Sequence, residues 1–111
     1  MYLKKLSSLL LISIITFSVN AQEIRTFFWD DENKIIQSEG IFKEGKEHGI
    51  WKFWNKEGKL VRESEFYKGE IKGRVTYFYE NGNKMNEGFI FKGIQSGLYK
   101  EWYSDGTLNT I

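Results

Sequence analysis

The stretch "YFYENGNKM", residues 77–85, decides the fold because it joins two runs of strand-forming residues through a glycine turn. The same outline recurs as "KFWNKEGKL" at residues 52–60 and "KEWYSDGTL" at residues 100–108. Aromatic and β-branched residues are typical of strands, and a short polar stretch that ends in glycine is typical of a hairpin turn. Each stretch therefore predicts two antiparallel strands joined by a tight loop.

The glycines repeat with a fixed period of 24 residues, and nine of the eleven fall on it. A period between about 20 and 50 residues indicates a repeat architecture. We expect all nine to be structural turn glycines: Gly45, Gly49, Gly58, Gly69, Gly73, Gly82, Gly93, Gly97 and Gly106.

The turn inside each unit is predicted to be a three-residue loop. A two-residue type I′ turn needs positive φ at both central residues, and glutamate, which stands before Gly58, is a poor choice for that conformation. A type I turn followed by a left-handed glycine at a G1 bulge needs positive φ only at the glycine. It also suits Asn33 in the first unit, since asparagine tolerates this region well. The connector turns, "KGEIKG" and "KGIQSG", are expected to use both of their glycines in the same way.

The repeat divides the chain into units at about 26–48, 49–72, 73–96 and 97–111. The first unit aligns with an offset of 25 over its first half, which places Phe28 and Trp29 on Phe53 and Trp54. A one-residue difference in strand length, such as a bulge, explains this offset. We therefore predict an all-β fold, an elongated antiparallel meander of about 3.5 stacked β-hairpins over residues 22–111.

Residues 1–21 have the layout of a secretory signal peptide. Lys4 and Lys5 precede an apolar run, residues 6–19, and Ala21 ends a small-residue cleavage site. A helix over that run is about 21 Å long, short of the roughly 30 Å of a bilayer core. We expect cleavage after Ala21 and export to the periplasm, the cell envelope or the medium, and a retained membrane tether is the alternative.

Charge and composition exclude several functions. Without residues 1–21 the chain has one more acidic than basic residue, so it offers no basic field for nucleic acid. It has no cysteine for disulfides or zinc. The sequence contains no nucleophile elbow, phosphate loop or zinc-protease motif, so we expect neither an enzyme nor a cofactor.

Three motifs resemble the MORN-type repeat family, most closely the bacterial variant often labelled as YwqK-like antitoxins. They are "GIWKFWNKEGKL" at 49–60, "YENGNKMNEG" at 79–88 and "FKEGKEHG" at 42–49, within a resemblance that covers the chain from about Phe27 onward. The resemblance implies strings of β-hairpins that act as interaction modules. It also implies roles in protein binding, membrane association and, for the bacterial label, toxin neutralisation.

An aromatic residue recurs at one position of every unit and is expected to form a structural ladder on one sheet face, with Tyr67 and Phe91 beside it. This packing is favoured over an aromatic platform for a ligand. The ladder comprises Trp29, Trp54, Phe78 and Trp102.

The opposite face is also apolar, so it either curls into a core or meets a partner. Its tyrosines favour a half-solvated binding surface. The candidate partner-binding face comprises Trp51, Phe53, Val75, Tyr77, Tyr79 and Tyr99.

Two polar features are expected to be ordinary surface. The only histidine, His48, stands in a connector without convergent partners, and we expect it to be solvated. The acidic run from Asp30 to Glu32 has the oxygens that calcium prefers, but it lacks the EF-hand pattern and is expected to be a hairpin tip.

These observations predict an exported, non-catalytic module that binds a protein through its aromatic face or an open edge strand. The last unit stops at residues 107–111 before its return strand is complete, so self-association through this edge is also expected. Two alternatives stay open: an immunity or antitoxin protein that neutralises a toxin, and a module that binds glycan or a membrane surface.

Overall fold

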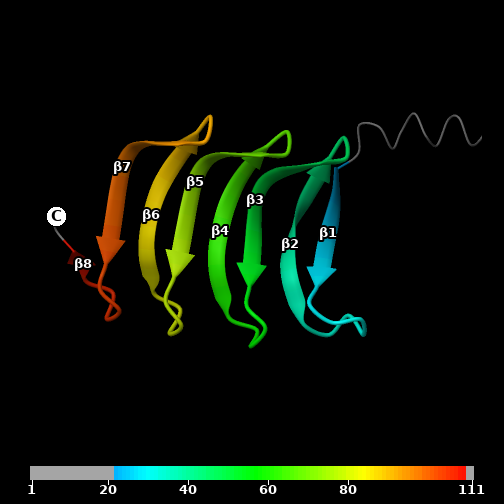
Figure 1. Ribbon diagram of the computed structural model, residues 1–111, viewed down its shortest axis with the longest axis horizontal. Coiled ribbons are helices and arrows are strands. Elements are labelled where there is room, and N and C mark those ends of the chain that lie inside the picture. The colour runs from blue at the N-terminus through cyan, green and yellow to red at the C-terminus, as the bar shows by residue number, and fades with distance from the viewer. Residues whose placement is uncertain (1–21, 110–111) are drawn as a thin grey trace, which may run out of the picture.

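The computed structural model describes residues 22–109 and shows one open antiparallel sheet of eight strands (Figure 1). No helix in this part of the chain is long and apolar enough to cross a membrane. The expected signal peptide lies outside the described residues. The strands are β1 (Gln22–Phe28), β2 (Ile36–Lys43), β3 (Lys46–Trp54), β4 (Leu60–Tyr67), β5 (Glu70–Phe78), β6 (Lys84–Phe91), β7 (Ile94–Trp102) and β8 (Leu108–Asn109).

The strands follow one another across the sheet in chain order, from β1 to β8. Each pairs antiparallel with its neighbour in sequence, so every 24-residue unit is one hairpin joined to the next by a connector turn. This arrangement confirms the predicted all-β meander of hairpin repeats.

The loops inside the hairpins have the predicted geometry. The Gly58 N–H donates to the Asn55 carbonyl at 3.0 Å, and the Asn55 N–H donates to the Lys59 carbonyl at 2.9 Å. Gly58 has a φ of 81°, which is the left-handed conformation of a glycine at a G1 bulge. The loops that end at Gly82 and Gly106 repeat both hydrogen bonds.

The first hairpin loop is longer, which corrects the expected difference in strand length. Seven residues separate Phe28 from Ile36, whereas five separate the strands of the later hairpins. Phe28 pairs with Ile36 as Trp54 pairs with Leu60, so Phe28 takes the strand position that the alignment gave to Trp29. The offset of 25 displaced β1 by one residue, because the additional residues lie in the loop.

The connector turns differ from the prediction. They are two-residue turns in which Glu44, Lys68 and Lys92 have φ of 53°, 50° and 52°, and each is followed by a glycine that also has positive φ. Two positive values are the mark of a type I′ turn, whose twist matches that of the flanking strands. A connector of only two residues therefore imposes on Glu44 and the two lysines the conformation that we expected glutamate to avoid.

The second glycine of each connector lies inside the next strand and not in the turn. Gly49, Gly73 and Gly97 sit in β3, β5 and β7 with positive φ, where three residues face a single residue of the preceding strand. Such bulges bend a strand, and Figure 1 shows β3, β5 and β7 turning sharply towards their connector ends.

Polar contacts link neighbouring hairpin loops. The Tyr79 hydroxyl donates to the Trp102 carbonyl at 2.7 Å, and the Asn81 and Asn83 amides donate to the Ser104 carbonyl at 2.7 and 2.9 Å. These side-chain bonds hold the third and fourth loops in a fixed spacing.

Candidate functional site

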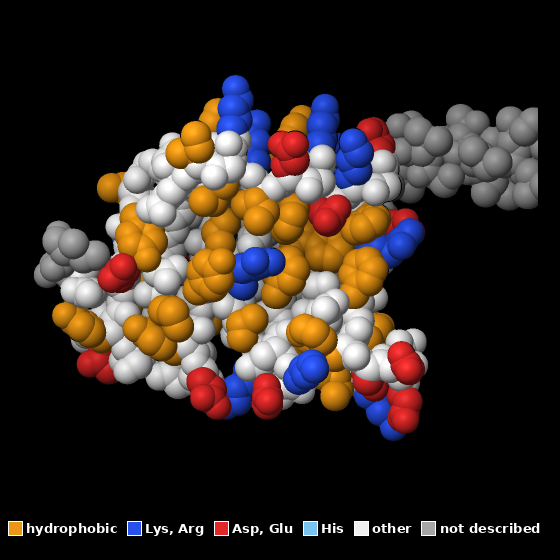
Figure 2. Space-filling model, viewed as in Figure 1, with side chains coloured by type: hydrophobic (Ala, Val, Ile, Leu, Met, Phe, Trp, Pro, Cys, Tyr) orange, Lys and Arg blue, Asp and Glu red, His pale blue; other side chains and the backbone are white. Residues whose placement is uncertain are grey.

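The strand register places four of the predicted binding residues in two rows on one face of the sheet, which we call the Trp51 face. Trp51, Ser64, Val75 and Gly88 are directly opposite one another on β3 to β6. Residues directly opposite one another point to the same side of the sheet. Hydrophobic side chains gather over the middle of the sheet in the view of Figure 2. The second row comprises Phe53, Arg62, Tyr77 and Asn86.

Aromatic rings fill the first half of the Trp51 face, from β1 to β4. The Trp51 ring lies 6.2, 5.5 and 6.3 Å from the rings of Phe27, Phe42 and Phe66, and Phe53 lies 6.4 Å from Phe66. Trp51 is only 2% exposed, and its indole N–H donates to the Ile41 carbonyl at 3.1 Å. This half of the face is the core of the protein.

A glycine makes room for the Trp51 ring. A Cβ built on Gly40 would stand 2.3 Å from the indole, closer than atoms pack in proteins. The indole therefore lies flat against the backbone of β2. The same pairing recurs 48 residues later, where a Cβ on Gly88 would stand 3.2 Å from the Tyr99 ring.

The second half of the Trp51 face, from β5 to β8, holds a groove. It lies where the pair of residues in the middle of the sheet differs from the equivalent pairs on either side. Val75 stands at the position of Trp51 and Tyr99, and Ser64 stands at the position of the two glycines. A cavity of about 810 Å³ opens above Val75, lined also by Tyr77, Asn86 and Tyr99. Tyr77 and Tyr99 are 43% and 41% exposed, and neither belongs to an aromatic ring pair in the described part of the chain. This volume is in the range of ligand sites.

Arg62 lies at the boundary between the two halves. Its guanidinium carbon stands 4.0 Å from the centre of the Phe53 ring, and its side chain also lines the groove. Within residues 22–109 it forms no ion pair, and its buried Nε has no hydrogen-bond partner. Sequence reasoning missed this residue, although the period places it directly between Phe53 and Tyr77.

The predicted partner-binding residues have three different environments. Trp51 is buried at 2% exposure, so it is a core residue and not a surface for a partner, which corrects that part of the prediction. Val75 is buried at 9% exposure and lines the floor of the groove. Tyr79 is half-buried, and its hydroxyl binds the next hairpin loop. Tyr77 and Tyr99 remain open to a ligand, while half-buried Phe53 lies beneath Arg62.

The predicted aromatic ladder lies on the opposite face, which we call the Trp54 face. Trp54, Phe78 and Trp102 are half-buried and pair with the first residue of the next strand. Trp29 lies outside the ladder, in the first loop, where its indole N–H donates to the Trp54 carbonyl at 3.0 Å and its ring is 42% exposed.

The sequence had suggested that Tyr67 and Phe91 lie beside the ladder, but the structure places them elsewhere. Each ends its strand at a connector turn, whereas Trp54 and Trp102 end theirs at the hairpin loops. The Lys72 ammonium stands 5.0 Å from the Tyr67 ring centre and 5.2 Å from that of Phe91. A lysine ammonium group therefore lies between these two aromatic residues at the connector end, where they are 46% and 47% exposed.

Between these aromatic ends, a polar row crosses the Trp54 face. The Thr76 hydroxyl donates to the Glu87 carboxylate at 2.7 Å, and Lys84 approaches the same carboxylate at 3.2 Å. Partial burial raises the pKa of Glu87, but the Thr76 hydrogen bond and Lys84 outweigh it and hold the pKa below its ordinary value. The row comprises Thr26, Glu39, Lys52, Glu63, Thr76, Glu87 and Lys100.

His48 lies in β3 and not in a turn, which corrects its predicted position. It pairs with Ile41, is half-buried, and its ring centre stands 5.8 Å from that of Tyr67. Packing against the tyrosine gives His48 a structural role.

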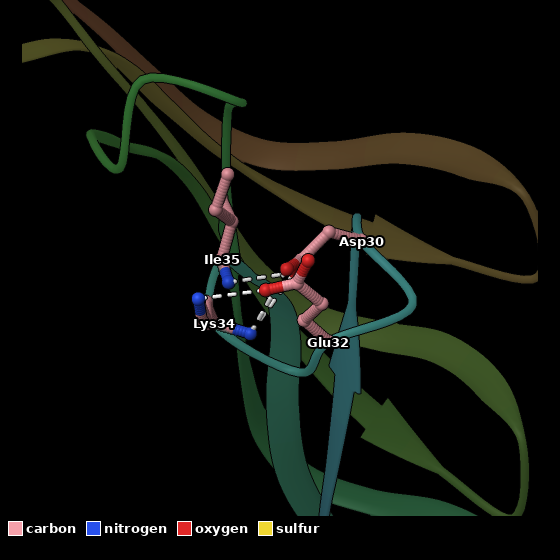
Figure 3. A network of polar contacts seen from close by, with 4 residues as sticks. All are labelled: Asp30, Glu32, Lys34 and Ile35. Atoms are coloured by element: carbon pink, nitrogen blue, oxygen red, sulfur yellow. Dashed lines mark hydrogen bonds and ion pairs between the residues drawn. The ribbon is translucent and has the colours of Figure 1, made fainter.

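The acidic run from Asp30 to Glu32 closes the first hairpin loop. The Asp30 carboxylate accepts hydrogen bonds from the N–H groups of Lys34 and Ile35, at 3.0 and 2.8 Å, and Glu32 pairs with Lys34 (Figure 3). The Ile35 N–H is the main cause of the lowered pKa of Asp30. No group of three or more potential metal ligands occurs among residues 22–109. The carboxylates therefore act on the loop itself.

The fold and its two unlike faces define a β-hairpin repeat protein. The family model of the MORN repeat variant matches residues 47–68 and 71–92. These matches coincide with the hairpins β3–β4 and β5–β6, so each matched segment is one structural unit.

No curated protein and no solved structure matches this chain.

Proposed function

We propose that this chain is a non-catalytic binding module that holds a protein partner in the groove of the Trp51 face. One observation carries the proposal: rings fill the first half of this face, whereas the second half leaves two half-exposed tyrosines around an open groove. Tyrosine offers an apolar ring and a polar hydroxyl, and it is enriched in protein interfaces.

The repeat architecture supports this function. The two central hairpins match the MORN repeat variant, and such repeats generally serve as modules for binding proteins or membranes and not as catalysts. Most of the residues that line the groove belong to the second matched hairpin, β5 and β6, and the others come from β4, from β7 and from the turn before β7.

The outer edge of β7 supports a second contact with a partner. In the described residues β8 pairs only with Glu101 and Trp102, which leaves the rest of β7 without a neighbour on that side. Unpaired edge groups accept a strand from a partner or a second copy.

Export and toxin neutralisation are narrower forms of this proposal. Export rests on the layout of residues 1–21, and neutralisation rests on the resemblance to antitoxins. Co-expression with candidate toxins tests neutralisation, and growth that is never rescued removes it. Binding to a glycan or a membrane surface is the remaining alternative, and the near-neutral charge gives little attraction to anionic lipid.

The test is cross-linking in the native host followed by affinity capture, comparing the tagged protein with its Tyr77→Ala/Tyr99→Ala variant. A Phe89→Ala/Leu98→Ala variant is the control, because these side chains are 43% and 74% exposed and neither lines the groove. We expect one specific protein to be lost from the tyrosine variant and kept by the control.

Thermal unfolding of both variants must accompany the capture. Two outcomes contradict a binding role for the groove. Either both variants retain the partner, or both lose it to an extent that follows the decrease in their melting temperatures.

A further inference from the structure

We infer that the groove binds a peptide segment in which an aromatic side chain stands next to a carboxylate. The inference rests on the proposed function and names the chemistry of the partner. Two independent features of the groove support it: a missing ring above Val75 and a guanidinium without a carboxylate at Arg62.

The missing ring follows from comparison of three equivalent positions. Trp51, Val75 and Tyr99 are 24 residues apart, and the two rings each lie against a glycine of the preceding strand, Gly40 and Gly88. At Val75 the chain supplies an isopropyl group instead, and the cavity of about 810 Å³ stands above it.

The floor and walls of this cavity favour an aromatic side chain. Val75, Ile71 and Ile90 line it with apolar atoms, and Tyr77 and Tyr99 present ring surface. Aromatic side chains bury a large apolar area and gain further from contact with other rings. A hydroxylated sugar would leave more of this apolar floor unused.

The carboxylate follows from Arg62. Its guanidinium lines the cavity, is stacked on Phe53 at 4.0 Å, and has no acidic partner in the described part of the chain. Stacking fixes the plane of the guanidinium, and a planar guanidinium binds a carboxylate through two parallel hydrogen bonds.

The remaining polar groups of the groove suit a peptide backbone. Asn86 and Gln95 line the groove from the neighbouring strands β6 and β7, and a carboxamide side chain both donates and accepts hydrogen bonds, as a peptide group does. The other charged residues that line the groove, Glu70 and Lys92, have opposite signs. Glu101 pairs with Asn86 at the margin of the groove and lies beside Tyr99, so the site for a carboxylate is the guanidinium of Arg62 and not a net positive charge.

In the first experiment the isotope-labelled protein is titrated with each of four probes, and binding is monitored by the NMR signals of its amides. Acetyl-Trp-Glu-amide carries both features, acetyl-Trp-Gln-amide lacks the charge, acetyl-Ala-Glu-amide lacks the ring, and N,N′-diacetylchitobiose represents a saccharide. We expect the first probe to bind at least about tenfold more tightly than the others, because each removed feature leaves a groove group without its partner. The perturbed amides should surround Val75, Gly88 and Tyr99.

Two variants separate the two features. Ser64→Gly/Val75→Trp recreates the Gly40 and Trp51 pair and should fill the groove, so binding of every probe is lost while the protein stays folded. Arg62→Gln should reduce the affinity for acetyl-Trp-Glu-amide to that of acetyl-Trp-Gln-amide and leave the affinity for the uncharged probe unchanged.

Several outcomes overturn the inference. Equal affinity for the charged and uncharged probes would refute the need for a carboxylate. Tighter binding of the saccharide would refute a peptide as the ligand. If sedimentation shows that the protein self-associates and that self-association blocks the groove, a second copy of the chain is the occupant of the groove. If no probe binds but the tyrosine variant still loses a captured protein, the inference fails and the proposed function stands. If the capture also shows no loss, both fail.

Discussion

From β1 to β4, five rings fill the space above the Trp51 face; from β5 to β8, two tyrosines stand apart around a groove of about 810 Å³. Both halves have the same 24-residue period, the same two-residue connector turns and the same bends at glycine. Two differences between equivalent residues produce this contrast. Gly40 and Trp51 in the first half are replaced by Ser64 and Val75 in the middle, and Ile90 stands at the position of Phe42 and Phe66. One half of a repeat array can therefore supply stability while the other supplies a binding surface.

The largest expected effect comes from removing one ring from each half, which tests whether only the first half is core. Trp51→Ala should destabilise the protein by about 3–5 kcal/mol, because the indole is almost fully buried among three rings. Tyr99→Ala should cost about 1 kcal/mol or less, because its ring is 41% exposed. Urea denaturation of both variants measures the difference, and similar losses would mean that the second half is core as well.

The two glycines beneath the rings offer a second comparison. Gly40→Ala places a Cβ 2.3 Å from the Trp51 indole and should destabilise by about 1–3 kcal/mol, since the surrounding rings leave the indole no room to move. Gly88→Ala should stay within about 0.5 kcal/mol, because the contact is 3.2 Å and the exposed Tyr99 ring can shift. Equal melting temperatures for the two variants would refute the tight fit at Gly40.

The pair at Ser64 and Val75 tests whether the halves can be made alike. Val75→Trp alone should destabilise, because Ser64 has the Cβ that the equivalent glycine lacks, and the double variant with Ser64→Gly should recover. We expect a favourable coupling energy of about 1 kcal/mol in a double-mutant cycle. Additive effects of the two substitutions would show that the small residue does not make room for the ring.

The smallest effect concerns acid stability on the Trp54 face. The pKa of Glu87 is held below its ordinary value of 4.5, so its ionised form stabilises the fold above that pH, and this contribution is lost as the pH falls through the lowered pKa. Thr76→Val removes the hydroxyl donor and should cost about 1 kcal/mol at neutral pH.

Equilibrium unfolding from neutral to acid pH checks this prediction. The stability gap between the variant and the parent protein should narrow as the pH falls below 4.5 and through the lowered pKa of Glu87, because the carboxylate then becomes protonated. A gap that does not change with pH would show that Thr76 stabilises by packing alone.

The hairpins and their loops could be predicted from the sequence because the glycine period and turn chemistry are local signals. The place of Trp29 could not, because the sequence pattern does not distinguish a strand bulge, which adds one residue, from a hairpin loop that is two residues longer than the others. A slip of one residue transfers a whole strand to the other face of a sheet. Phe27 is therefore found beside Trp51, while Trp29 lies in the loop.

The role of each face was also beyond the sequence. Both faces carry aromatics, and only the packed structure shows that Trp51 and Val75 are buried while Tyr77 and Tyr99 are not. The groove depends on contacts between strands of different units, such as that of Gly88 with Tyr99, which no pattern within one unit describes. The 24-residue comparison of Trp51, Val75 and Tyr99 was the one available signal.

The sequential strand order has a consequence for how the molecule opens. Each described strand pairs only with its neighbours in sequence, so within residues 22–109 no segment that is distant in sequence secures either end of the sheet. In such a quasi-one-dimensional array, local opening begins at an end and spreads one hairpin at a time. Amide hydrogen exchange should therefore be slowest around Trp51 and Ser64 and grow faster towards β7 and β8, so that the groove side of the molecule samples opened states that the aromatic core does not.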